Sequence, residues 1–593
     1  MRNPLFRLKI KMFFFTQILC LIAISFPSIA ISSEPVSKTN FLLVSDSQEK
    51  NSIKLVDNLK RALQCAGHTF VEVDVTALPG MTRKDFTESA LILCCEKAAS
   101  QIFPPDALSY VQDGGILYFA YRCFHPELMN PLGMKARDGP HMFVDARGLE
   151  AHRPFFRQCR PELQIPLFVS NGCNIDVSQE WEVQLNYKNP PNIPLLLTRS
   201  FGKGQVIFWN SSCLQMKEFR GLFLFSLLRS LPIAAMSVFN RIILQIDDSP
   251  PPAYDLKRGV VARDFGFSDF QFYQNIFYEQ VMQLLEELAV PATHFLIFNY
   301  QDQIRGPFNK TIDRLEFFDN IIKKILNTRG HDLGLHGYNH QSLMLTGTTS
   351  RSWPSIEEMS QSLQQAFSMW QEKKLPPCMV YVPPNNLIDN AGKQAILNAF
   401  PTICTICRVY TSGNDYRVEA FNRDGGGDEF GPDEKFPRLL LMPRISSGFY
   451  LTELVRFSVL NGILTHGVFS HFIHPDDIYD SVRAKSNWEI MLLNLRRLLL
   501  FAKENLPAAE ATTAGKFMLP MKKYFEENIH FEQNSTCLKV IQQKGFREFF
   551  YVFSRDASGD PVIHGGKLIA TLEPNRLFLV KAVEPTMEIL FSH

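Results

Sequence analysis

Short apolar runs alternate with amphipathic stretches over most of the chain, beginning near residue 38. Between 38 and 235 the apolar runs have the length and composition of buried strands. They are Phe41–Val44, Phe70–Val73, Ala90–Leu93, Ile116–Phe119 and Val206–Trp209. Two stretches, Lys54–Ala66 and Arg220–Leu231, repeat apolar residues at helical spacing. Strands that alternate with helices predict a parallel sheet covered by helices, so we expect an α/β domain over 38–235.

The same alternation is stronger from 236 to about 510. Seven strands are predicted there: Ile242–Ile246, Thr293–Phe298, Leu333–Leu335, Met379–Val382, Ile403–Val409, Leu439–Met442 and Gly467–Ile473. Helical patterns separate most of them, at Phe272–Leu288, Leu315–Asn327, Ser355–Gln371 and Leu451–Leu460, and another follows at Trp488–Lys503. This order predicts a distorted (β/α)7 barrel, in which chemistry gathers at the C-terminal ends of the strands.

The two ends of the chain have different patterns. Residues 511–593 contain short apolar runs separated by glycine turns, which predict a small β-rich domain. A carbohydrate-binding role and a packing role both stay open for that domain. Residues 1–33 combine a basic start, an apolar run from Met12 to Phe26 and small residues after Pro27, as a signal peptide does. We therefore expect an extracytoplasmic protein, periplasmic or secreted, with an uncleaved anchor as the alternative.

Composition and charge narrow the class of protein. A chain of 593 residues is too long for one hydrophobic core, which agrees with several domains. Lys plus Arg number 61 and Asp plus Glu number 60, so bulk charge does not favour a nucleic-acid partner. Twelve cysteines are scattered without a regular framework, and their pairing cannot be read from the sequence.

The segment 38–235 loosely resembles the class I glutamine-amidotransferase-like fold, which is flavodoxin-like. Cys123 follows a predicted strand, but it lacks the flanking glycines that a nucleophile elbow requires. No Ser/His/Asp set accompanies it. We therefore expect this domain to be non-catalytic.

Two adjacent acids end the first strand of the predicted barrel. Asp247 and Asp248 come directly after the apolar run Ile242–Ile246, and prolines follow. Side chains of neighbouring strand residues point to opposite faces, so one carboxylate can bind a metal while the other reaches a water. A solvated loop start is the alternative interpretation of this pair.

Two histidines end the third predicted strand. His336 and His340 are four residues apart, which brings both imidazoles to one side if the chain turns helically after the strand. Two histidines and one carboxylate are a common ligand set for an open catalytic zinc site. We predict that Asp248, His336 and His340 converge within metal-coordinating distance, whereas His331 precedes the strand and is expected to be structural.

Two further histidines lie in the last predicted strand and just after it. His471 and His474 are three residues apart, so they face opposite sides of an extended chain. His474 stands at the strand end before Pro475, where the pocket of a barrel opens. We therefore expect His474 to be catalytic and His471 to be packed behind the site.

These motifs together resemble the polysaccharide deacetylase superfamily, the NodB homology domain of carbohydrate esterase family 4 and its relatives. The resemblance covers roughly 236–510, and the whole chain resembles an uncharacterised bacterial branch in which an amidotransferase-like domain precedes the barrel. It implies that Asp248, His336 and His340 bind zinc or another divalent metal. It also implies that Asp247 is the catalytic base and His474 the catalytic acid.

One position departs from the family pattern. Members of the superfamily often have an arginine, within an Arg-x-Pro pattern, that orients the base, but this chain has Tyr381 before Pro383. Tyr381 can donate a hydrogen bond and cannot supply a charge. Arg444, after the sixth predicted strand, is the candidate to replace the missing arginine from another direction.

The resemblance implies an amide hydrolase that removes acetyl groups, N-acetyl in the first place, from an extracellular or cell-envelope polysaccharide. It also suggests an association with a polysaccharide export system of the envelope. Two alternatives stay open. One is an inactive deacetylase-like protein that binds glycans or partners in polysaccharide export, and the other is a glycosidase on a related barrel, which would need two carboxylates beside the scissile bond.

Overall fold

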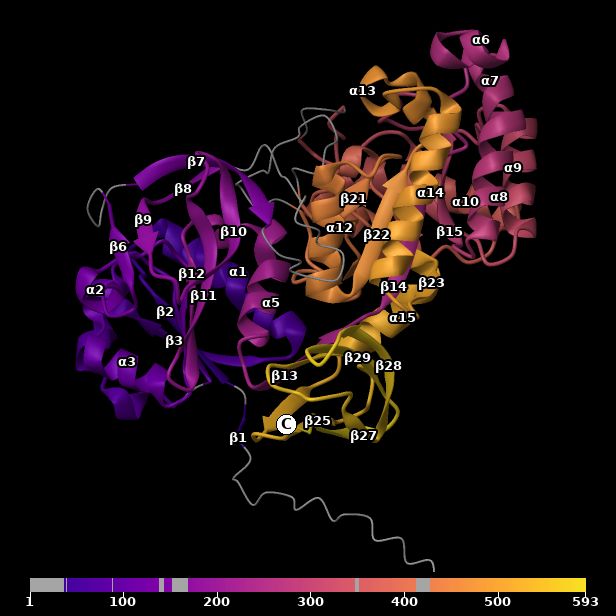
Figure 1. The fold of residues 1–593 in the computed structure, drawn as a ribbon. Coiled ribbons are helices and arrows are strands. Elements are labelled where there is room, and N and C mark those ends of the chain that lie inside the picture. The colour runs from indigo at the N-terminus through magenta and orange to yellow at the C-terminus, as the bar shows by residue number, and fades with distance from the viewer. Residues whose placement is uncertain are drawn as a thin grey trace, which may run out of the picture. The chain divides into compact units, whose positions relative to one another are not determined.

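The computed structural model describes residues 37–38, 40–87, 89–137, 143–151, 169–346, 351–411 and 427–592 (Figure 1). The predicted signal peptide, residues 1–33, lies outside these described residues. Among the helices that are described, none has both the length and the apolar character needed to cross a bilayer.

The first sheet has nine strands in the order β3-β2-β4-β5-β12-β11-β10-β7-β8. Five are parallel: β2 (Asn40–Ser45), β3 (Thr69–Asp74), β4 (Ala90–Leu93), β5 (Ile116–Phe119) and β12 (Gly204–Trp209). These confirm the five strands predicted for this part of the chain. The other four are antiparallel and were not predicted: β7 (Phe143–Ala151), β8 (Val169–Cys173), β10 (Glu182–Asn189) and β11 (Pro194–Phe201).

Two helices confirm the helical patterns predicted for the same segment. α1 (Lys50–Ala66) buries Leu55, Leu59 and Ala62 and ends at Gly67, whose φ of 92° is the left-handed conformation that glycine adopts readily. α5 (Arg220–Leu228) is buried along its whole length. Its contacts include α12 (Glu453–His466) of the following segment. A helix that is apolar all round is expected to be covered on every side.

The second sheet is curled and has ten strands. Its seven predicted strands lie side by side and are parallel, in the order β20-β18-β17-β16-β15-β14-β22. They are β14 (Arg241–Ser249), β15 (Ala292–Asn299), β16 (Asp332–Asn339), β17 (Val380–Tyr381), β18 (Thr405–Ile406), β20 (Leu440–Leu441) and β22 (Val468–Ile473). β14 is buried at all nine positions, as expected for a strand covered on both faces.

The exact (β/α)7 arrangement is not confirmed. Three short strands join the sheet: β19 (Gly431–Pro432), β21 (Ser446–Ser447) and β23 (Glu510–Thr512). Within the described residues, β20 and β21 are not paired with each other. The segment between them crosses from one strand to another, because the amide of Arg444 donates to the carbonyl of Arg408 while the amide of Ile445 donates to that of Ser470.

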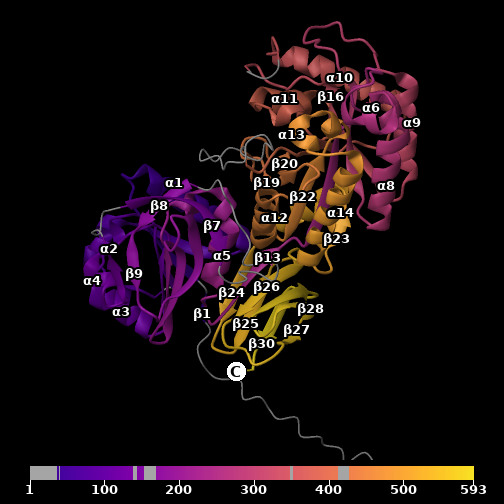
Figure 2. The ribbon, with the colours of Figure 1, turned by 45° about the horizontal axis from the view of Figure 1, so that its top comes forward.

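Helices follow most of these strands and cover the sheet. They include α8 (Tyr278–Glu287), α9 (Leu315–Asn327), α10 (Ile356–Glu372), α11 (Asn390–Ala399) and α14 (Trp488–Asn505). α9 buries Phe318, Ile321, Ile322 and Ile325 at helical spacing, so one face packs inward and the other is polar. Figures 1 and 2 show α14 running alongside β22.

The last part of the chain forms two sheets that share one core. One has the order β1-β24-β25-β30-β27 and the other β13-β26-β29-β28. Their strands are β1 (Ser37–Lys38), β13 (Ile233–Val238), β24 (Ile529–Gln533), β25 (Cys537–Gln542), β26 (Phe549–Ser554), β27 (Val562–His564), β28 (Gly566–Glu573), β29 (Leu577–Ala582) and β30 (Thr586–Leu590). β13 pairs antiparallel with β26, so residues before the curled sheet complete this β structure.

Candidate metal and catalytic site

The two adjacent acids at the end of β14 have different surroundings. Asp248 has a φ of 49°, a left-handed conformation that is uncommon for a residue with a side chain. Such conformations persist only where the surrounding structure holds them, and they are frequent at functional sites. The turn directs the Asp248 carboxylate toward two histidines of β16 and its C-terminal end, whereas Asp247 faces an arginine.

Asp248, His336 and His340 lie together, as predicted. The Asp248 Oδ1 is 3.4 Å from Nε2 of His336 and 3.6 Å from Nε2 of His340. One ligand atom from each of the three residues lies within 4.8 Å of the others. Zinc bonds of about 2.1 Å in a tetrahedron separate ligand atoms by roughly 3.4 Å. The spacing therefore fits a divalent metal, with no rearrangement of the backbone.

His336 is held in the form that a metal ligand needs. Its Nδ1 lies 2.8 Å from the carbonyl oxygen of Val382, to which it donates, so the lone pair of Nε2 faces Asp248. Burial lowers the pKa of His336, which favours the neutral imidazole. This hydrogen bond fixes the ring orientation before any metal binds.

The predicted helical turn between the two histidines is not formed. β16 continues to Asn339, and the chain bends at Gly337, whose φ is +129°. A Cβ at Gly337 would lie 2.7 Å from the carbonyl oxygen of Asn339, so only glycine fits there. The glycine bend, rather than a helix, brings His336 and His340 to the same side.

Tyr300 is a neighbour of the metal trio that the sequence patterns did not single out. Its hydroxyl donates to the carbonyl of Pro250 at 2.9 Å and lies 3.5 Å from Oδ1 of Asp248. Its ring stacks on that of His340 with centroids 6.1 Å apart. The available signal was its place directly after β15, at the strand end where site residues are expected.

Asp247 forms a buried ion pair with Arg444. Nη1 of Arg444 donates to Oδ2 of Asp247 at 2.5 Å, and the two side chains are 0% and 2% exposed. The guanidinium lies over the Phe472 ring, 3.7 Å from its centroid. The other carboxylate oxygen, Oδ1, is buried and has no hydrogen-bond partner among the described residues. An unpartnered buried oxygen of this kind can accept a proton or a hydrogen bond from a water in the site.

Tyr381 and Pro383 do not make the contact with Asp247 that Arg444 makes. The Tyr381 hydroxyl is buried and makes no hydrogen bond within the described part of the chain, so it does not reach Asp247. The carbonyl of Pro383 accepts from the amide of Asn386 at 2.9 Å and so starts a turn beside the site.

His474 lies on the other side of Asp247. Its Nε2 is 3.7 Å from Oδ2 of Asp247, and its Nδ1 is 3.4 Å from Oδ1 of Asp477. Asp477 also accepts from Arg483 at 2.8 Å. Burial lowers the pKa of His474, but the charges of Asp477 and Asp247 outweigh it and raise the pKa to about 10. The imidazole is therefore protonated at neutral pH and can donate a proton.

His471 has the surroundings of a packed residue. Its Nδ1 lies 2.8 Å from Oγ of Ser446, and its Nε2 donates to the carbonyl of Gly448 at 2.7 Å. It is 0% exposed, and burial lowers its pKa to about 4. A neutral ring with both nitrogens occupied has no atom free for substrate. His331 lies outside the site as well, with its Nδ1 3.0 Å from Nε2 of His294.

None of the cysteines that the structure describes takes part in the site. Cys123 is fully buried, and burial raises the pKa of its thiol well above the usual range, which disfavours the reactive thiolate. The metal trio is the one group of ligand-type side chains in the described ranges that has metal-like spacing. Cys404 and Cys407, which are three residues apart, therefore belong to no such group.

A family model described as "Uncharacterised protein conserved in bacteria (DUF2194)" matches residues 164–578, which is more than half of the chain. The chain belongs to the DUF2194 family. The matched range includes every residue of the metal trio, Asp247, Arg444 and His474. Among curated proteins, this DUF2194 chain has no match.

Three solved structures are similar to this DUF2194 chain in part. A putative polysaccharide deacetylase from Mycobacterium smegmatis has 15% identity and a TM-score of 0.30, and the match covers 48% of this chain and 89% of that one. A family 4 acetyl xylan esterase from Clostridium thermocellum, in complex with a cobalt ion, has 14% identity and a TM-score of 0.27, with 48% and 93% covered. The β-galactosidase from Rahnella sp. R3 has 13% identity and a TM-score of 0.24, with 34% of each chain covered.

The chain spans about a third of the length of the β-galactosidases it matches. At these identities and TM-scores, none of the three structures identifies a function for the DUF2194 chain. The evidence for its function lies in the residues of the chain itself.

Proposed function

We propose that the chain is a metal-dependent hydrolase that removes acetyl groups, N-acetyl in the first place, from a polysaccharide outside the cytoplasm. The observation that carries the proposal is the juxtaposition of three functions at the C-terminal ends of β14, β16 and β22. An open ligand set includes Asp248, and the next residue back, Asp247, is a buried carboxylate paired with Arg444. A protonated histidine, His474, has its Nε2 3.7 Å from Oδ2 of Asp247. This is the set that hydrolysis of an amide or ester by a metal-activated water requires.

Asp248, His336 and His340 would hold the metal, zinc or another divalent cation. When bound, the metal supplies a Lewis acid that polarises the acetyl carbonyl and lowers the pKa of a water. The ligand set leaves coordination positions open, as catalytic zinc sites do. His340 is about one-third exposed at its side chain, so the open side of the trio faces solvent.

Asp247 is the proposed base and His474 the proposed acid. The free Oδ1 of Asp247 accepts the proton of the attacking water, while Arg444 holds Oδ2 in an ion pair. His474 enters the reaction protonated, because its raised pKa exceeds neutral pH, and donates that proton to the departing amine. Asp477 holds the imidazole and so sets which ring nitrogen, Nε2, faces the reacting group.

The substrate and setting belong to the proposal as well. We propose an acetylated envelope or extracellular polysaccharide as substrate, an export signal in residues 1–33, and an association with polysaccharide export. The resemblance of the motifs and the signal-like N-terminal pattern support these points.

The test is acetate release by the purified full chain from N-acetylated and O-acetylated oligosaccharides. Activity should disappear under chelation and return with added zinc, and His340→Ala should bind no metal and release no acetate. Chain cleavage that survives chelation would instead support a carboxylate-pair glycosidase. Glycan binding without any acetate release by the metal-loaded protein would support the inactive alternative.

A further inference from the structure

A series of polar contacts leads from Asp247 away from the metal trio, fully buried at Arg444 and partly buried beyond it. Nη2 of Arg444 donates to Oδ1 of Asn386, so its guanidinium joins Asp247 to Asn386. Nε of Arg444 has no partner among the described residues. On the side away from Asp247, the guanidinium is therefore held by its contact with Asn386 and by its stacking on Phe472.

Asn386 is itself held by an arginine. Nε of Arg408 donates to the carbonyl oxygen of Asn386 at 3.1 Å, and Nη1 of Arg408 donates to Oδ1 of Asp428 at 2.8 Å. Asn385 and Asn386 have φ values of 55° and 58°, two consecutive left-handed residues. Such a turn is costly for residues with side chains unless neighbouring groups hold it. Arg408 supplies that hold at the carbonyl.

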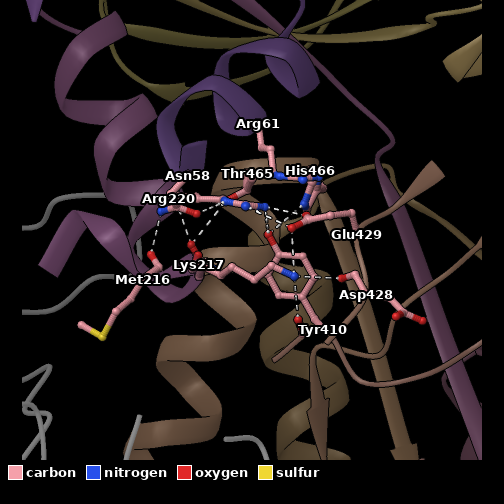
Figure 3. Close-up of polar contacts among 12 residues, drawn as sticks. Asn58, Arg61, Met216, Lys217, Arg220, Tyr410, Asp428, Glu429, Thr465 and His466 are labelled. Atoms are coloured by element: carbon pink, nitrogen blue, oxygen red, sulfur yellow. Dashed lines mark hydrogen bonds and ion pairs between the residues drawn. The ribbon is translucent and has the colours of Figure 1, made fainter. Parts of the chain in front are cut away.

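Residues 428–429 are fixed in turn by two buried cations from the preceding segment (Figure 3). Nζ of Lys217 donates to the carbonyl of Asp428 at 3.1 Å and lies 2.9 Å from Oε1 of Glu429. Both terminal nitrogens of Arg220 donate to Glu429, at 2.6 and 3.1 Å. Lys217 is 6% exposed and Arg220 2% exposed, so both cations are shielded from solvent, whereas the Glu429 side chain is 28% exposed. Although burial opposes ionisation, the two cations lower the pKa of Glu429 to about 2.

We propose that Asn386 and Arg408 are positioning residues for Asp247. Asn386 holds the guanidinium of Arg444 so that Nη1 stays on the base, and Arg408 holds Asn386 by joining its carbonyl to Asp428. The effect on rate rests on the proposed hydrolase function, whereas the effect on the Asp247–Arg444 pair does not.

The chain offers a closely matched control at the residue before Asn386, Asn385. Asn386→Gly keeps the left-handed backbone and removes the acceptor oxygen, and Asn386→Asp keeps the acceptor. Asn385→Gly changes a residue of the same conformation whose side chain, within the described ranges, bonds Ser342, through Nδ2 at 3.3 Å. We expect Asn386→Gly and Arg408→Met to lower kcat about 10- to 100-fold, as loss of a supporting contact typically does, with KM and zinc affinity near those of the natural protein. Asn386→Asp should retain most of kcat, and Asn385→Gly nearly all of it.

A second measurement is independent of any substrate. The free energies of unfolding of Asp247→Asn, Asn386→Gly and the double variant form a cycle, which should be non-additive if Asn386 acts on Asp247 through Arg444. The same cycle with Asn385→Gly should be additive. If the natural protein releases no acetate, the hydrolase proposal fails and the cycle still decides the positioning role. An additive Asn386 cycle, or equal kcat values for Asn386→Gly and Asn385→Gly, would overturn the positioning role.

Discussion

The division of labour between His474 and His471 gives the sharpest test of the proposed mechanism. Replacing His474 by alanine removes the proton donor, and loss of a general acid typically slows turnover about 100- to 10,000-fold. The fold should change little, because both carboxylates next to His474 keep an arginine. Asp477 still accepts from Arg483 at 2.8 Å, and Asp247 still accepts from Arg444 at 2.5 Å.

Replacing His471 by alanine should have the opposite result. The variant loses the contacts of the ring with the buried hydroxyl of Ser446 and with the partly buried carbonyl of Gly448. Each lost partner costs up to about 1–3 kcal/mol, most at the buried Ser446 hydroxyl. A loss near 3 kcal/mol corresponds to a fall of roughly 6–12 °C in Tm for a domain of about 150–250 residues. Turnover per folded molecule should stay close to that of the natural protein.

Both variants should be measured by thermal unfolding and by acetate release, with the folded fraction used to normalise the rate. Zinc binding provides the control, since neither histidine is among the metal trio. If His471→Ala abolishes turnover without lowering Tm, and His474→Ala lowers Tm without slowing turnover, the assigned roles are reversed and the mechanism is refuted.

Three further outcomes are expected. His340→Ala should abolish zinc binding measured by calorimetry while circular dichroism stays unchanged; retained zinc binding would contradict the ligand assignment. Asp477→Asn removes a charge that raises the pKa of His474, so that pKa should fall and the alkaline limb of the pH–rate profile should move to lower pH. An unshifted or raised limb would contradict the acid role. Cys123→Ala should leave turnover intact in a folded protein, because a fully buried thiol cannot reach substrate.

Strand positions were the most predictable part of the fold. Ile242–Ile246 lies inside β14, and Gly467–Ile473 differs from β22 by one residue, since a buried strand between helices reads as a continuous apolar run. Short pairings such as β19 and β21 could not be predicted, because two-residue strands have no pattern of their own. The pairing of β13 with β26 joins residues about 300 apart, and no local signal contains such a contact.

In the site, the ligand-type residues at strand ends were predictable, whereas the residues that hold them in place were not. Asp248, His336 and His340 stand out because carboxylate and imidazole groups follow apolar runs. The bend that unites the two histidines depends on the φ of Gly337, and the sequence favoured a helical turn instead. Asn386 carries no signal at all, since its importance comes from a contact with Arg444 that is 58 residues away.

The replacement of an expected arginine shows which property of the site is constrained. A buried carboxylate such as that of Asp247 is costly unless a cation is in contact with it. Tyr381 occupies the expected position and cannot meet this need, and its hydroxyl does not reach Asp247. Arg444 meets it from the segment that crosses from β18 to β22, with Phe472 beneath its guanidinium. The proposed mechanism therefore requires a cation within hydrogen-bonding distance of Asp247, not an arginine at one particular strand end. A cation supplied from a new direction needs new supports, which explains why Asn386 and Arg408 lie behind it.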